Sequence, residues 1–126
     1  MKLLAIDYGS KTIGLAISNN AGTIAFPHAT LARTSGVIKN LKKIIADQGI
    51  QEIIVGIPSY KTDTPFYRDL QKFISALKAA CDVPVRTQDE LVTSREAKNR
   101  SGGRDDRHDL AAQIILETYL QTKNPS

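Results

Sequence analysis

The sequence predicts a single α/β domain with a mixed five-stranded sheet flanked by helices. Residues 3–6 form an unbroken apolar run, which is typical of a strand covered on both faces. Strand-like segments over residues 2–8, 12–18 and 23–32 are joined by short turns and predict a three-stranded antiparallel meander. From residue 36 onward helical and strand-like patterns alternate, which adds two parallel strands. Because 126 residues can bury one core, we expect one domain over residues 1–126.

The later elements follow from apolar spacing and from turn signals. Apolar residues at helical spacing predict helices over about 36–48, where Gly49 ends the pattern, and over about 64–81. Residues 52–56 and 83–88 predict short strands, and residues 110–120 carry the strongest helical pattern. Pro27 cannot donate a ladder hydrogen bond, so it predicts an edge position or a bulge in the third strand.

Composition restricts the compartment more than it restricts the partner. No apolar run approaches the ~18 residues of a membrane span, and the apolar residues before Asp7 are too few for a signal peptide. The single cysteine, Cys81, cannot form an internal disulfide, which fits a reducing environment. We therefore expect a cytoplasmic protein without membrane association. The net charge of +4 favours anionic partners only mildly.

Acidic residues stand at the ends of three predicted elements. Asp7 ends the first strand, Asp89 and Glu90 follow the fifth, and Asp109 stands at the start of the last helix. Such positions can converge on one edge of a sheet, where carboxylates repel one another unless divalent cations bind between them. The alternative is that Asp7 only caps the turn at Ser10.

Four motifs together resemble a known family. They are residues 7–14 (DYGSKTIG), 55–58 (VGIP), 89–97 (DELVTSREA) and 108–112 (HDLAA). In this order and at similar spacing they resemble the YqgF family, also called RuvX, of Holliday junction resolvases with a ribonuclease H-like fold. The predicted meander followed by alternating helices and strands is the element order of that fold. The resemblance covers nearly the whole chain.

The resemblance implies a metal-dependent nuclease. By position in the motifs, Asp7, Glu90 and Asp109 would be catalytic and would bind Mg²⁺ or Mn²⁺, with Asp89 and His108 as auxiliary residues. In such enzymes one metal activates the attacking water and the other stabilises the leaving oxygen. The family's roles are Holliday junction resolution and maturation of the 5′ end of pre-16S rRNA. The implied partner is branched DNA or structured RNA, bound by a monomer or a homodimer.

Basic residues near these motifs are candidate contacts for the phosphate backbone, because lysine and arginine bind phosphates in nucleic-acid sites. They are Lys11, Lys61, Arg95, Lys98, Arg104 and Arg107. The alternative is a set of solvated loops, since Glu96 and Asp105 partly neutralise the longest basic stretch.

Two other functions are compatible with the sequence. The family usually has arginine at the positions of Thr12 and Leu91, so a catalytically impaired nucleic-acid-binding protein is the main alternative. Nucleotide binders of the sugar-kinase and actin type also begin with Asp-x-Gly. Those proteins hold ATP between two domains, whereas this chain has room for one.

Overall fold

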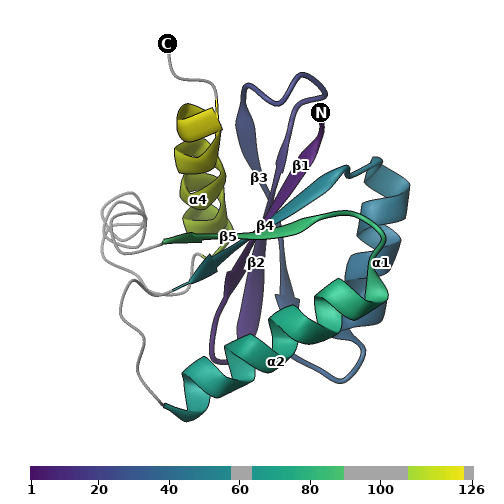
Figure 1. Cartoon of the computed structure of the whole chain (residues 1–126), viewed down its shortest axis with the longest axis vertical. Coiled ribbons are helices and arrows are strands. Elements are labelled where there is room, and N and C mark those ends of the chain that lie inside the picture. Colours follow the sequence, from purple (N-terminus) through teal and green to yellow (C-terminus); the bar gives the residue numbers. More distant parts are fainter. Residues whose placement is uncertain (58–63, 90–107, 124–126) are drawn as a thin grey trace.

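A computed structural model of the protein describes residues 1–57, 64–89 and 108–123 (Figure 1). The elements are β1 (Leu3–Tyr8), β2 (Thr12–Ser18), β3 (Ala25–Ala32), α1 (Val37–Gln48), β4 (Glu52–Ile57), α2 (Pro65–Ala80), β5 (Val85–Asp89) and α4 (His108–Lys123). Every predicted element is present within a few residues of its predicted bounds. The last helix begins two residues earlier than predicted and so includes both His108 and Asp109.

The five strands form one sheet in the order β3-β2-β1-β4-β5. β1, β2 and β3 pair antiparallel, and β4 and β5 pair parallel with β1 and with each other. This arrangement confirms the predicted meander with two added parallel strands. The carboxyl ends of β1, β4 and β5 therefore lie at the same edge of the sheet.

Helices cover both faces of the sheet (Figure 1). Leu4 and Ile6 of β1 pack in a cluster with Leu41 of α1 and with residues of α2. The alternate residues Leu3 and Ala5 pack instead with α4. All six residues of β1 are buried, as its unbroken apolar run predicts. None of the helices in the described ranges is long and apolar enough to cross a membrane.

A buried carboxylate anchors the far end of α4. Glu52, at the start of β4, is 3% exposed, and its Oε1 accepts a hydrogen bond of 3.1 Å from the Tyr119 hydroxyl. Arg86 of β5 donates to the same oxygen. Burial, with help from the hydrogen bond to Glu52, raises the pKa of Tyr119, which keeps the phenol protonated as a donor. With this end held, the first turn of α4 lies at the edge where β1 ends.

β3 is an edge strand with a bulge, which confirms both readings of Pro27. Ala16 of β2 pairs with Pro27, whereas the neighbouring Leu15 pairs with Ala29, so His28 is the extra residue. Proline lacks the N–H that a ladder position requires, and an edge strand with a bulge tolerates this loss.

Candidate active site

The centre of the candidate site is a contact between Asp7 and His108. Asp7 is 7% exposed and lies one residue before the end of β1. His108 is the first residue of α4, and its Nδ1 lies 2.6 Å from Oδ2 of Asp7. An ionised carboxylate can only accept, so Nδ1 carries the proton in this contact. The histidine thus supplies the donor that a buried carboxylate requires.

Two glycines allow α4 to approach the hairpin of β1 and β2. Gly14 is the cross-strand partner of Asp7, and a Cβ placed there would lie 2.1 Å from the carbonyl of His108 and 2.7 Å from the backbone nitrogen of Asp109. A Cβ at Gly9 would lie 2.9 Å from the imidazole ring of His108. Only glycine at these positions permits the contact between His108 and Asp7.

Asp109 is brought to the same place by its backbone. It lies in the first turn of α4, beside Gly14, where the helix dipole favours an acidic residue. The structure therefore brings Asp7 together with His108, 101 residues away along the chain, and with the backbone of Asp109.

Arg33 holds the turn that follows β1. Its Nη1 donates hydrogen bonds of 2.9 Å to the carbonyl of Gly9 and 2.8 Å to that of Ser10. Its backbone N–H donates a hydrogen bond of 3.0 Å to the carbonyl of Lys11. One residue at the end of β3 thus satisfies the carbonyls of three consecutive turn residues. Both side-chain hydrogen bonds come from Nη1, which leaves Nη2 to face Asp69, and a lysine has only one nitrogen for all of these acceptors.

The same guanidinium links the turn to α2. Arg33 lies over the ring of Tyr8, with Cζ 4.2 Å from the ring centroid, and its Nη2 lies 3.6 Å from Oδ2 of Asp69. Tyr8 also packs against Phe66 and Phe73. Burial raises the pKa of Tyr8 in spite of the opposing charge of Arg33, so the phenol is neutral near pH 7. This cluster fixes the residue that follows Asp7.

Replacing Arg33 with alanine should loosen the turn and lower the free energy of unfolding by about 1–3 kcal/mol, because two carbonyls and the Tyr8 ring lose their partner. Arg33→Lys should recover only part of this loss, since it restores the charge without the second terminal nitrogen at Asp69 and without the planar group over Tyr8. Urea unfolding measures both, with Lys39→Ala, an exposed residue of α1, as the control. An Arg33→Lys protein as stable as the parent would show that charge alone holds the turn.

Asp89 is placed at the expected edge by its backbone. It is the last residue of β5 and pairs with Ile57 of β4, which neighbours β1. Two strand spacings separate β5 from β1, a distance of roughly 10 Å. Glu90, the predicted catalytic residue next to it, lies outside the described residues.

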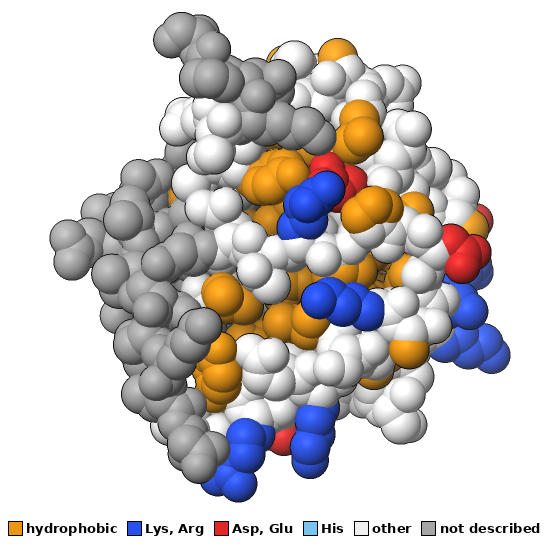
Figure 2. Space-filling view, in the orientation of Figure 1, with side chains coloured by type: hydrophobic (Ala, Val, Ile, Leu, Met, Phe, Trp, Pro, Cys, Tyr) orange, Lys and Arg blue, Asp and Glu red, His pale blue; other side chains and the backbone are white. Residues whose placement is uncertain are grey.

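Of the predicted phosphate contacts, only Lys11 lies in the described part of the chain, where it is exposed in the turn after Ser10. Lys61, Arg95, Lys98, Arg104 and Arg107 lie outside it, as does Leu91. On the face of the molecule drawn in Figure 2, the described basic side chains are spread out and are not gathered in one patch. The described residues on this face thus offer no single basic track for a nucleic acid.

The donors at this edge are those of a hard-cation site, but the described set is small. Carboxylate oxygens suit Mg²⁺ and Mn²⁺, and Asp7 keeps lone pairs beyond the one that faces His108. Within residues 1–57, 64–89 and 108–123, no group of three His, Cys, Asp or Glu side chains is arranged to hold a metal ion.

Sequence reasoning treated His108 as auxiliary and did not identify Arg33. The histidine adjoins a motif, and its contact with Asp7 depends on how α4 packs. Arg33 belongs to no motif and follows a strand of unremarkable sequence. Its role depends entirely on where the end of β3 lies relative to the turn after β1, which no local pattern reports.

Comparison with known proteins gives a family match over almost the whole chain. The model of the RuvX family, described as Holliday junction resolvase, matches residues 1–122. A protein of Maridesulfovibrio salexigens with the provisional name of pre-16S rRNA nuclease is 34% identical over 132 residues, covering 95% of this chain and 98% of its own.

Two solved structures share the fold at low sequence identity. The RuvC protein of T. thermophilus, solved in complex with a Holliday junction substrate, has a TM-score of 0.68 and 14% identity and covers 98% of this chain and 95% of its own. The Holliday junction resolvase of fowlpox virus has a TM-score of 0.59 and 12% identity, with 97% of this chain and 99% of its own covered. These likenesses confirm the ribonuclease H-like fold.

Proposed function

Since this chain belongs to the RuvX family, we propose that it is a divalent-metal-dependent endonuclease that hydrolyses phosphodiester bonds in structured nucleic acid. Processing of the 5′ end of pre-16S rRNA is the first candidate role, because relatives above 30% identity carry that name. Holliday junction resolution is the second, favoured by the description of the family model. We further propose that residues 1–126 act as one cytoplasmic domain, as a monomer or a homodimer.

The observation that carries the proposal is the buried carboxylate of Asp7 at the end of β1, held by the first residue of α4. Burying a charge costs free energy, and a protein without a use for that charge would be more stable with an apolar residue there. A buried, oriented carboxylate at the carboxyl end of a strand is typical of a ligand or catalytic site in an α/β fold.

In the proposed mechanism, Asp7, Glu90 and Asp109 would hold the cations, with Asp89 beside them. The bound cations would activate the attacking water and stabilise the leaving oxygen. The chain's own residues orient this set. His108 fixes the rotamer of Asp7 through Oδ2 and leaves its other oxygen lone pairs for ligation. Arg33 fixes the turn that presents the exposed Lys11, which would contact a phosphate.

The alternative is a nucleic-acid-binding protein with impaired catalysis. Thr12 stands where the family usually has arginine, and the structure uses its carbonyl as the acceptor of a 2.9 Å hydrogen bond from Gly9 N–H. That contact depends on the backbone only, so it supports the turn equally well with either side chain. Threonine at position 12 therefore removes the positive charge of the family's usual arginine but leaves the backbone geometry near Asp7 unchanged.

Cleavage of two labelled substrates tests the proposal. One is an RNA that spans the 5′ end of 16S rRNA with its precursor extension, and the other is a four-way DNA junction. Each is incubated with Mg²⁺, Mn²⁺ or a chelator, with the Asp7→Asn protein as the negative control. Metal-dependent cutting at defined positions is expected, and the substrate that is cut identifies the role. Binding of both substrates without cutting would instead establish the impaired binder.

A further inference from the structure

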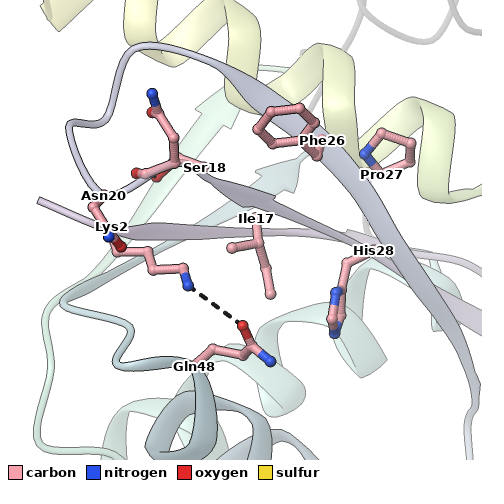
Figure 3. Close-up of a pocket in the computed structure, with 9 residues that line it drawn as sticks. Lys2, Ile17, Ser18, Asn20, Phe26, Pro27, His28 and Gln48 are labelled. Atoms are coloured by element: carbon pink, nitrogen blue, oxygen red, sulfur yellow. Dashed lines mark hydrogen bonds between the residues drawn. The ribbon is translucent and has the colours of Figure 1, made fainter.

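A pocket with a mixed apolar and polar lining lies at the other end of the sheet from Asp7. It has a volume of about 390 Å³ and is lined by Lys2 just before β1, by the end of β2 and the turn after it, by β3 and by the last turn of α1 (Figure 3). Its lining includes Lys2, Ile17, Asn20, Phe26, His28 and Gln48. In Figure 3 the side chains of Ile17, His28 and Gln48 project into the same space. No part of the proposed catalytic site lies here.

The bulge in β3 explains why this space is open. His28 is the extra residue of the bulge, and a bulge bends its strand away from a regular ladder. β3 is also the edge strand, so no further strand covers this side in the described part of the chain. The segment from Phe26 to His28 is exposed, although its neighbour Ala25 is buried.

The lining carries one lysine and several unused polar groups. It contains Lys2 and His28 but no aspartate or glutamate. Within the described residues the side chains of His28 and Asn20 make no hydrogen bond, and Lys2 Nζ reaches only Oε1 of Gln48, at 3.4 Å. By contrast, the side-chain oxygens of Ser18 and Asn19 in the same pocket already accept hydrogen bonds. Ser18 Oγ accepts from the backbone N–H of Leu3, and Asn19 Oδ1 accepts from those of Thr23 and Ile24. The free groups therefore face a ligand or water.

An exposed aromatic ring completes the pocket. Phe26 is 52% exposed, and it is one of the few large apolar side chains on the described surface that are so exposed. A half-exposed aromatic ring next to a lysine and side-chain amides matches the parts of a nucleotide. The ring offers a stacking face, the amides of Asn20 and Gln48 can pair with a base edge, and Lys2 can neutralise a phosphate.

We propose that this pocket binds an unpaired nucleotide of the nucleic acid on which the enzyme acts. The proposal rests on the proposed function for its choice of ligand. Ile17 lies three residues along β2 from Gly14, the partner of Asp7, so the two sites are separated by roughly 10 Å along the strand. Ile17 packs on the α1 side, whereas Asp7 contacts α4. A bound strand that joins them passes around the free edge of β3.

Binding of a fluorescein-labelled single-stranded RNA of ten uridines, measured by anisotropy, tests the proposal without any need for cleavage. Phe26→Ala should weaken binding about 5- to 100-fold, the range that loss of one stacked base produces. Ile24→Ala is the matched control, because Ile24 is 53% exposed on the neighbouring segment but does not line the pocket. Lys2→Gln should reduce the salt dependence of binding.

The outcomes separate this proposal from the proposed function. Equal binding by the Phe26→Ala and Ile24→Ala proteins, or no binding of the RNA by the parent, overturns the pocket assignment even if the enzyme cuts its substrates. Selective loss with Phe26→Ala supports the pocket even if no cleavage is found. Urea unfolding of both variants checks that each protein remains folded.

Discussion

Replacing Gly14 with alanine is expected to displace the first turn of α4 and to destabilise the protein. The added Cβ would lie 2.1 Å from the His108 carbonyl, which is backbone and cannot rotate away. Either the helix moves or β2 bends, and overpacking of this kind costs about 1–3 kcal/mol or more. Because α4 covers β1, β2 and β3, the strain reaches the core cluster that α4 shares with the sheet. Urea unfolding should show the loss directly.

Gly36→Ala is the matched control for this experiment. Nothing lies within 4 Å of a Cβ at Gly36, where the backbone angle φ is −91°. The only expected cost is the poorer N-cap of α1, at most about 1 kcal/mol. If the Gly14→Ala and Gly36→Ala proteins unfold at the same urea concentration, α4 does not approach β2 closely at Gly14. The position of His108 beside Asp7 would then also be wrong.

Replacing Asp7 with asparagine is expected to abolish most cleavage while the fold survives. Asparagine has the same shape and can still accept a hydrogen bond from His108, so the Asp7→Asn protein should unfold near the parent's urea midpoint. The charge that would hold the cations is lost. We expect the rate to fall roughly 100-fold or more, the scale associated with removing a group that stabilises charge in the transition state.

The control for this substitution is Asp47→Asn, which removes an exposed carboxylate on α1. It changes the net charge equally but lies away from the candidate site. Substrate binding should be similar for both variants, and only Asp7→Asn should lose cleavage. Equal cleavage by the Asp7→Asn and parent proteins would place the activity elsewhere or attribute it to a contaminant.

His108→Ala tests whether the imidazole and the Asp7 carboxylate stabilise each other. It leaves the Asp7 carboxylate buried without this donor and should cost about 1–3 kcal/mol of stability. In the Asp7→Asn background the same change should cost less, since no buried charge remains. The cost of His108→Ala in the parent minus its cost in the Asp7→Asn background gives the coupling free energy of the pair. Equal costs in both backgrounds would mean that the imidazole and the carboxylate are not coupled.

The fold was predictable because its signals are local. The apolar run of residues 3–6, the glycine that ends α1 and the apolar spacing of α4 each depend on a few adjacent residues. Pro27 predicted an edge strand or a bulge because a missing N–H is a property of one residue. Side chains that alternate between the two faces of a strand fix its register, and the rules for connecting strands then leave few possible arrangements of the sheet.

The sequence by itself determined the element order, the mixed sheet and the placement of acidic residues at strand and helix ends. Only the tertiary structure decided that His108 contacts Asp7 and that Gly14 makes room for it. It also decided that Arg33 binds the turn after β1. These contacts join residues far apart in the chain, and their geometry depends on how α4 and the end of β3 pack against the hairpin. Local patterns record which face a residue occupies, but not which side chain it meets there.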